Sequence, residues 1–385
     1  MTELDVDLAV VGAGIVGAAC AHAAAEEGLR VAVVEAVAPA AGTTSAGMGH
    51  IVVLDGSPAE LALTRYSQRL WAELGPRLPP GVSFRSEGTL WIARSEEDLR
   101  TAESKAERLH GARIPAELLD GEELAMMEPL LRDGLAGALL VPEDLLLDPI
   151  AATQALLEQV RERGGQVVAG AVVRRTAPGR LEGDHGLVVR ARGIVNAAGV
   201  RAPELTPGLP IAPRKGHLVL LARGRGRIRH QVVEIGYGAG VRSAEPVSVA
   251  MNLHPRADGS VLVGASREWA GFDGSVDPRV VDRLLAKVRE FAPPLSEWPR
   301  AGTRAGFRPA TPDHLPWIGR MPDAPDLLVA AGHEGLGVTE SLGTARLVLD
   351  AFLDRASPIP PEPYRPDAGR LAQSFSVPRE ASTAH

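Results

Sequence analysis

The sequence predicts an α/β fold in which a domain built on a parallel β-sheet is interleaved with a domain built on an antiparallel β-sheet. Three observations predict it: residues 6–35 follow the order strand, glycine turn, helix and strand, shorter strands with a tight turn follow residue 213, and a strand, glycine turn and helix return over residues 326–353. A chain of 385 residues suits two domains. We assign residues 1–80, 140–212 and 300–357 to the first domain, residues 81–139 and 213–299 to the second, and residues 358–385 to a C-terminal tail.

The opening unit has the βαβ order of a Rossmann-like nucleotide-binding domain. An apolar run over residues 6–11 is typical of a buried strand, and residues 12–17 form a G-x-G-x-x-G turn. A helix of small residues follows and ends at Gly28, and a second apolar strand ends on Glu35. A glycine motif flanked by two strands indicates nucleotide binding more specifically than the same motif without them.

Each glycine of the turn has a separate role in binding a dinucleotide. Gly12 makes the tight turn, Gly14 leaves bare backbone for a pyrophosphate, and Gly17 lets the helix pack closely on the sheet. The helix N-terminus adds unpaired N–H groups for the phosphates. Glu35 stands 18 residues after Gly17, where an acidic residue accepts hydrogen bonds from ribose hydroxyls and repels a 2′-phosphate, which argues against NADP.

Composition excludes several classes of protein. The net charge of −7 and the aromatic content of 4% argue against a nucleic-acid-binding surface. Residues 8–25 lack charge, but acidic residues precede them and their glycines have turn spacing, so we expect no transmembrane segment. The single cysteine, Cys20, excludes a disulfide framework, suits a reducing cytosol, and predicts a cytoplasmic protein. Ten histidines without ligand spacing predict no metal site.

The elements after Glu35 are predicted from caps and apolar periodicity. A segment of small residues, 38–49, can lie close to a ligand. The further predicted elements are helix 57–74, strand 84–93, helix 95–110, a short helix capped by Asp120 and Glu123, helix 148–163, strand 166–173, a strand ending at residues 196–199, strands 215–221, 247–253 and 260–265, helix 277–291, a turn-rich stretch 302–319, strand 326–331, and helix 338–353.

Five stretches together resemble the flavin-dependent D-amino-acid oxidase family: residues 10–17, 42–50, 196–199, 306–319 and 332–333. The likeness covers residues 5–355 and is nearest to the branch of glycine oxidase, sarcosine oxidase and D-hydroxyproline dehydrogenase. It implies a D-amino-acid oxidase-like fold with non-covalent FAD extended across the first domain and its ring facing the antiparallel sheet. The positions it assigns to FAD are Gly12, Gly14, Ile15, Val16, Gly17, Glu35, Ala36, Thr43, Thr44, Gly47, Met48, Gly49, Val173 (with Val172 as a competing register), Ala198, Gly199, Gly306, Arg308, Gly332, His333, Glu334, Gly335, Leu336, Gly337 and Val338.

The resemblance also assigns a substrate site. Arg308 matches the family arginine that pairs with a substrate carboxylate, with a solvated arginine or a salt bridge to Asp313 as the alternatives. The N-terminus of the last helix would stabilise negative charge on reduced flavin. Further candidates for the substrate site are Tyr237, Met48, His50 and Asn252; Asn252 stands where the glycine oxidase branch carries a tyrosine. We expect Lys215 to be a solvated strand lysine, with a positive charge near the flavin as the alternative, and His217 and His254 to be structural.

These residues predict an FAD-dependent oxidoreductase that moves a hydride from the substrate Cα to the flavin and leaves an imine. The expected substrate is a small D-amino acid or secondary amine, with D-proline or a hydroxy-D-proline as the best guess. Glycine or sarcosine oxidation, an NAD-linked dehydrogenase, and a flavin-holding non-catalytic subunit remain alternatives. The electron acceptor, O2 or a redox partner, stays open, as does a homo- or hetero-oligomeric state.

Overall fold

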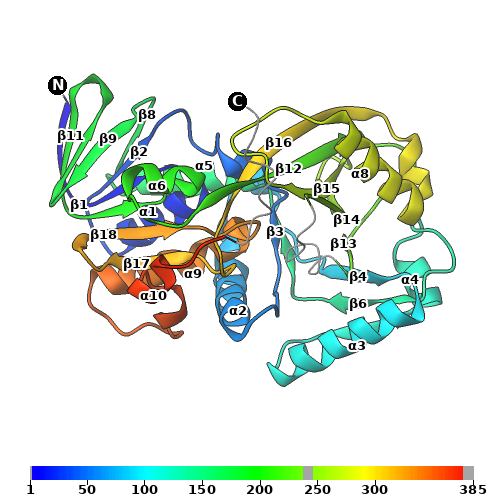
Figure 1. The fold of residues 1–385 in the computed structure, drawn as a ribbon. Helices are drawn as coiled ribbons and strands as arrows, with labels where there is room; N and C mark the ends of the chain where they lie inside the picture. The colour runs from blue at the N-terminus through cyan, green and yellow to red at the C-terminus, as the bar shows by residue number, and fades with distance from the viewer. Residues whose placement is uncertain (1, 237–245, 376–385) are drawn as a thin grey trace.

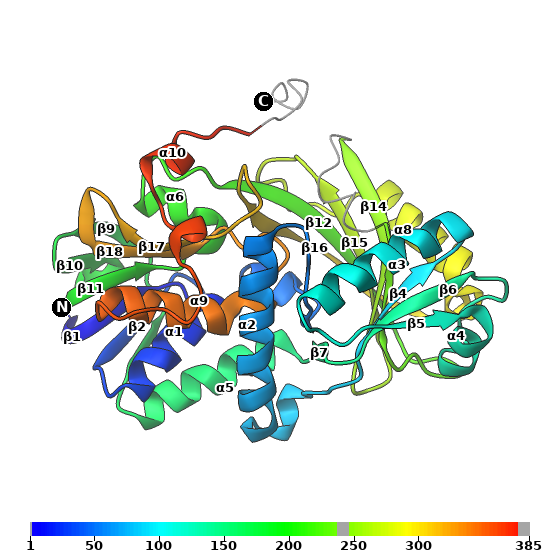
Figure 2. The ribbon, with the colours of Figure 1, turned by 90° about the horizontal axis from the view of Figure 1, so that it is seen from below.

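The described residues of the computed structural model, 2–236 and 246–375, form two lobes, each built on one β-sheet (Figure 1). Helix α2 (Pro58–Leu74) stands between the lobes in both views (Figure 2). The sequence therefore predicted the fold class correctly. The predicted substrate-site residue Tyr237 lies outside the described residues.

The first sheet has the path β17-β18-β11-β1-β2-β8, with a hairpin of β9 and β10 attached to β11. The strands from β18 to β8 are parallel, and β17 is antiparallel. Strands from three separate parts of the chain meet in this sheet. Their bounds are β1 (Thr2–Val11), β2 (Val31–Glu35), β8 (Gln166–Ala169), β9 (Val173–Ala177), β10 (Arg180–Gly183), β11 (Leu187–Asn196), β17 (Trp317–Met321) and β18 (Ala324–Ala331).

Helix α1 (Ile15–Glu26) is buried almost all round. Its many alanines let it lie close to β1 and to the helices α5 (Pro149–Glu162) and α9 (Gly337–Phe352), which share its hydrophobic core. A helix enclosed in this way has no solvent-facing polar side, which explains the long uncharged stretch in the sequence. The predicted βαβ unit is confirmed.

The second sheet has the order β16-β12-β15-β14-β13-β4-β6-β5 and is mostly antiparallel. Helix α8 (Pro278–Phe291) packs on one face, where Val219 and Leu221 join its core, and the opposite face turns toward the first lobe. The strands are β4 (Thr89–Ala93), β5 (Glu117–Asp120), β6 (Gly137–Val141), β12 (Ala212–Leu221), β13 (Gln231–Glu234), β14 (Val247–Pro255), β15 (Val261–Glu268) and β16 (Arg300–Ala310).

Smaller elements complete the two lobes. Helix α3 (Glu96–Gly111) lies on the face of β4 and β6 that carries Trp91, and residues of the helix form one hydrophobic core with Trp91. Further elements are the short pair β3 (His50–Ile51) and β7 (Leu145–Leu146), the 3₁₀ turn η1 (Thr43–Ala46), and helices α3 (Glu96–Gly111), α4 (Gly121–Met127), α6 (Ala202–Leu205) and α10 (Ala368–Leu371).

Three element predictions were wrong in part. The predicted strand 166–173 is divided, because Gly170 has a φ of +76° and ends β8, and β9 begins at Val173. The predicted strand 84–93 begins only at Thr89. The stretch 302–319, predicted as turns, contains the long strand β16, which pairs with β12 along its whole length, and strand β17. Strands β5 and β6 were not predicted.

Candidate functional site

The glycine turn before α1 has the geometry that a dinucleotide requires. Gly12 has a φ of +101°, and a Cβ on Gly12 would lie 2.5 Å from the carbonyl oxygen of Ala197. A Cβ on Gly17 would overlap the carbonyl oxygen of Gly12. A Cβ on Gly14 would lie 3.2 Å from Thr44 Oγ1, which is a tight contact, so the absence of a side chain lets Thr44 approach this turn. The predicted tight turn at Gly12 and the predicted close packing at Gly17 agree with this geometry, and the pyrophosphate position at Gly14 stays a prediction.

Two side chains organise the N-terminus of α1. Thr44 Oγ1 accepts a hydrogen bond from Ile15 N at 3.0 Å. Glu35 accepts from Ala13 N at 2.8 Å and, through its other oxygen, from Val37 N at 2.9 Å. A carboxylate has about four acceptor positions, so Glu35 keeps capacity for ribose hydroxyls. The exposed Ala36 follows it, and these residues fit the adenosine end of FAD.

The predicted pyrophosphate positions Ala198 and Gly199 lie beside this turn, and the predicted adenine positions lie at the start of β9. Ala198 Cα lies 3.3 Å from the position of a Cβ on Gly12, and Gly199 follows with a φ of +58°. Val173 opens β9 opposite Gly183, and Val172 O accepts from Asp184 N at 3.0 Å. The assignment of adenine to Val173 or Val172 remains a prediction.

Residues 43–49 lie at the contact between the two lobes. Thr43 Oγ1 donates to the Phe307 carbonyl at 2.6 Å. A Cβ on Gly306 would overlap Ala46, and a Cβ on Gly264 would lie 3.0 Å from Met48 Sδ. Bare backbone in the second sheet therefore lets this loop approach closely. Gly49 has a φ of +93° and contacts Leu147, so a side chain there would also be excluded.

The turn before α9 faces the same contact region. Gly332 has a φ of +89°, and His333 Nε2 lies 2.9 Å from Thr344 Oγ1. Burial lowers the pKa of His333 to about 3, so this imidazole is neutral. Gly335 is exposed, and Gly337 and Val338 form the first turn, near Val16 and Gly47 respectively. No side-chain cap of α9 exists within residues 2–236 and 246–375, so its first N–H groups suit a ligand.

Arg308 occupies the junction of the second sheet with this turn. Its Nη1 donates to the Ser266 carbonyl at 2.9 Å, and its guanidinium lies across Gly216, where a Cβ would overlap it. Its Nε lies 3.6 Å from the position of a Cβ on Gly335. Asp313 pairs instead with Arg370 at 2.7 Å, so among the described residues the alternative of an Arg308–Asp313 salt bridge is wrong.

A buried ion cluster lies beside Arg308. Glu334 has a φ of +44°, and its carboxylate pairs with Arg214 at 3.0 Å, Arg267 at 3.5 Å and His314 at 3.3 Å. Burial raises the pKa of Glu334, but its partners outweigh burial and hold it at about 2. Sequence reasoning missed this cluster, because Arg214 faces Arg308 only through the pairing of β12 with β16.

His50 and Asn252 come together through His254. The rings of His50 and His254 stack with centroids 4.8 Å apart, and Asn252 stands two residues before His254 on β14. Asn252 is opposite Gly264, against which Met48 lies. The structure therefore gathers Met48, His50 and Asn252 in one region.

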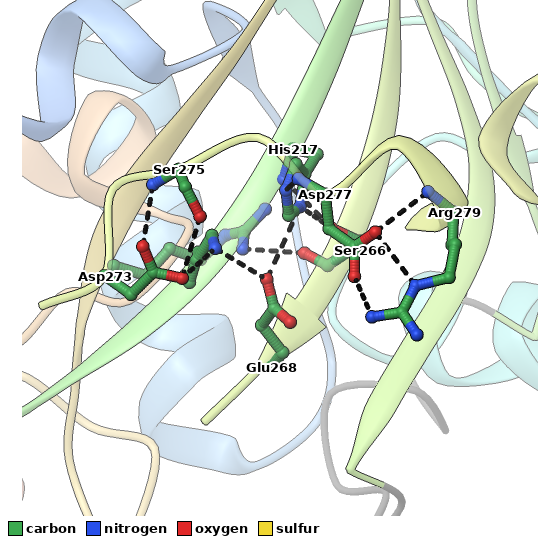
Figure 3. A network of polar contacts seen from close by, with 9 residues as sticks. His217, Ser266, Glu268, Asp273, Ser275, Asp277 and Arg279 are labelled. Atoms are coloured by element: carbon green, nitrogen blue, oxygen red, sulfur yellow. Dashed lines mark hydrogen bonds and ion pairs between the residues drawn. The ribbon is translucent and has the colours of Figure 1, made fainter. Parts of the chain in front are cut away.

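Lys215 and His217 lie on the α8 side of the sheet. Lys215 is 2% exposed and pairs with Asp273 at 3.0 Å and Glu268 at 3.4 Å, so the prediction of a solvated lysine was wrong. His217 lies 3.0 Å from Ser266 Oγ and accepts from the Asp277 backbone N–H at 3.0 Å (Figure 3). Both residues position the loop before α8.

The described residues contain neither a metal-binding cluster of side chains nor a helix that could span a membrane. Within residues 2–236 and 246–375, no three or more His, Cys, Asp or Glu side chains are arranged to hold a metal ion. In the same part of the chain, every helix is too short or too polar to cross a bilayer.

Comparison with known proteins agrees with this geometry. The family model described as FAD dependent oxidoreductase (DAO) matches residues 7–351. A glycine oxidase of Pseudomonas aeruginosa is 29% identical, over 94% of this chain and 98% of the relative. A D-amino acid dehydrogenase of Cereibacter sphaeroides is 30% identical, over 77% and 68%. The crystal structure of glycine oxidase from Geobacillus kaustophilus has a TM-score of 0.85 at 25% identity, covering 95% and 99%. This chain therefore belongs to the FAD dependent oxidoreductase family DAO, and is an FAD-dependent enzyme that acts on amino acids or amines.

Proposed function

We propose that the enzyme oxidises a small D-amino acid or cyclic secondary amine at Cα, with D-proline or a hydroxy-D-proline as the substrate. The observation that carries the proposal is the half-buried Arg308, which lies between Gly216 and Gly335 where the sheet meets the start of α9. A guanidinium there can hold a carboxylate through two parallel hydrogen bonds. Relatives named glycine oxidase and D-amino acid dehydrogenase support an amino-acid substrate.

Bound FAD would supply a two-electron acceptor for a hydride. The protein residues bind and orient the substrate: Arg308 would fix its carboxylate and so aim the Cα–H bond, which contributes through positioning. Met48 and the bare backbone of Gly264 would form an apolar wall that keeps water from the reacting carbon. The substrate loses one hydride and one amine proton, and water then hydrolyses the imine.

The first N–H groups of α9 would stabilise negative charge next to the substrate site. Each helix N-terminus carries about half a positive charge. Gly335 and Gly337, on either side of Leu336, carry no side chain at this end of the helix. The same feature is unnecessary for an NAD-linked dehydrogenase, so we infer that it serves the isoalloxazine ring.

Replacement of Arg308 tests the substrate role. Arg308→Lys keeps the charge but loses the planar pair of donors, and we expect kcat/KM to fall by about 10² to 10³. Flavin content should stay close to that of the unmodified enzyme. Arg300→Lys, at the exposed start of the same strand, is the matched control and should leave kcat/KM unchanged.

Anaerobic bleaching of flavin by a panel of D- and L-amino acids and amines identifies the substrate, and admission of air shows whether O2 accepts the electrons. Bleaching only by glycine or sarcosine would favour the alternative oxidase. Full turnover by Arg308→Lys, or the absence of bleaching by every amine, would refute the proposal.

A further inference from the structure

Four arginines stand at alternate positions in the loop that joins β12 to β13. This arginine row consists of Arg223, Arg225, Arg227 and Arg229, and all four are exposed. Within residues 2–236 and 246–375, none of the four forms an ion pair with a carboxylate. The chain as a whole carries a net charge of −7. An acidic protein therefore presents a concentrated positive charge in one loop.

The residues between the arginines fasten the loop to the second lobe. A Cβ on Gly224 would overlap the ring of Trp298, so the backbone lies directly on that side chain. A Cβ on Gly226 would lie 2.8 Å from Leu130 Cδ2, and Ile228 is only 1% exposed. Because these alternate positions pack inward, the arginines between them are held on the outer face of the loop.

A buried carboxylate fixes the end of the arginine row. Glu128 Oε1 accepts hydrogen bonds from Arg229 N at 2.8 Å and from His230 N at 2.7 Å. Glu128 follows α4, which lies at the end of the second lobe away from the first lobe in both views (Figure 1 and Figure 2). Met126, two residues earlier, is 74% exposed. The arginine row is therefore anchored at the far end of the molecule, beside an exposed apolar side chain.

The arginine row lies away from the candidate active site. Arg308 is opposite Arg214 near the start of β12, and the loop begins after Leu221, at the other end of the same strand. Leu221 is seven positions after Arg214. This separation corresponds to about 23 Å of strand. A partner that covers the arginine row therefore does not cover Arg308.

The charge around the arginine row is also positive. Arg300 is exposed and lies opposite Leu221, where the loop begins. Two exposed acidic residues border the loop: Asp258, in the turn that contacts Arg223, and Glu297, next to Trp298. The five arginines outnumber these two carboxylates. The surface is therefore complementary to an anionic partner.

We propose that the arginine row docks the enzyme, as a peripheral protein, on the anionic phospholipid surface of a membrane. Each guanidinium near such a surface raises the affinity roughly fivefold, so four give a factor on the order of several hundred. The exposed Met126 can enter the headgroup layer beside them. A protein partner fits less well, because a protein interface needs an apolar centre and Ile228, the apolar side chain of the loop, packs inward.

Co-sedimentation of the FAD-loaded enzyme with lipid vesicles tests the proposal. One set of vesicles is phosphatidylcholine alone, and in the other roughly a third of the lipid is phosphatidylserine. We expect binding to the anionic vesicles only. Raising the salt from about 0.1 M to about 1 M should release the enzyme, because the Debye length falls from about 10 Å to about 3 Å.

Removal of charge locates the binding surface. The double variant Arg225→Gln, Arg227→Gln should bind the anionic vesicles about thirtyfold more weakly. Its flavin content and its kcat/KM without vesicles should be unchanged, because the arginine row is distant from Arg308. The matched control is Arg69→Gln, Arg77→Gln, which removes two exposed arginines of α2 and the turn after it and should bind like the enzyme.

Three results would overturn the proposal. The first is no binding to anionic vesicles at low salt, or equal binding to neutral vesicles. The second is binding of the Arg225→Gln, Arg227→Gln variant as tight as that of the control. The third is an enzyme that ignores both kinds of vesicle but is retained on immobilised poly-L-glutamate through Arg225 and Arg227, because its partner is then an acidic protein.

Discussion

Glu334→Gln would remove a carboxylate that contacts both Arg214 and Arg267. The pKa of Glu334 is about 2 against an ordinary value of 4.5, a difference that corresponds to about 3 kcal/mol of stability at neutral pH. Glutamine keeps the shape of the side chain but withdraws this negative charge from two buried guanidiniums. We therefore expect the free energy of unfolding at pH 7 to fall by about 3 kcal/mol.

The stability difference between the enzyme and Glu334→Gln depends on pH, and its sign follows from the lowered pKa of Glu334. A carboxyl with a lowered pKa in the folded state stabilises fully above pH 4.5 and loses this contribution as the pH falls toward 2. Urea unfolding of enzyme and variant at pH 7 and at pH 3 measures it, and the difference should shrink at pH 3. Glu290→Gln, which removes an exposed partner of Arg94, is the control and should cost less than about 1 kcal/mol. A loss for Glu334→Gln no larger than for this control would refute the reasoning.

Three further predictions concern other parts of the chain. Gly17→Ala would place a methyl group against the Gly12 carbonyl oxygen, so we expect the protein to lose bound FAD and its free energy of unfolding to fall by about 1–3 kcal/mol. Flavin content and urea unfolding measure these two effects. Gly42→Ala is the control, because a Cβ there would meet no other atom, and it should change neither quantity. Thr44→Val removes the acceptor at the start of α1 and should weaken FAD binding by roughly fivefold, about 1 kcal/mol, in a fluorescence titration of the apoprotein; unchanged affinity would contradict it. Burial raises the pKa of Asp144 to about 7, and a raised carboxyl pKa destabilises increasingly as pH rises from 4 to 7. The free energy of unfolding of Asp144→Asn, taken relative to that of the enzyme, should therefore rise by about 3 kcal/mol between pH 5 and pH 8. If urea unfolding gives the same stability difference at both pH values, Asp144 ionises normally and the prediction is wrong.

Local signals in the sequence were sufficient for the helices and for the nucleotide unit. Ser57 Oγ accepts from Glu60 N at 3.1 Å, and Asp120 with Glu123 forms a full capping box, as their spacing predicted. Such caps involve residues within one turn of each other, so they can be read without the fold. The glycine roles in residues 12–17 were readable for the same reason.

Strand β16 could not be read in this way. Its glycines and charged side chains resemble a turn-rich stretch, and it becomes a strand through pairing with β12, which lies far away in the sequence. The same pairing places Arg214 opposite Arg308 and so builds the buried cluster around Glu334. Burial of Lys215 also depends on this sheet and on the loop that carries Asp273.

The sequence by itself determined the α/β class, the glycine turn and the acidic residue at the end of β2, because each rests on neighbours in the chain. Only the tertiary structure decided which polar atoms meet across the lobes. His50 and His254 belong to separate segments until β3 and β14 bring their rings together, and burial then leaves polar atoms of His50, His254 and Asn252 without partners among the described residues. The physical reason is that hydrogen-bond partners and desolvation are properties of packing between distant segments, which no local pattern specifies.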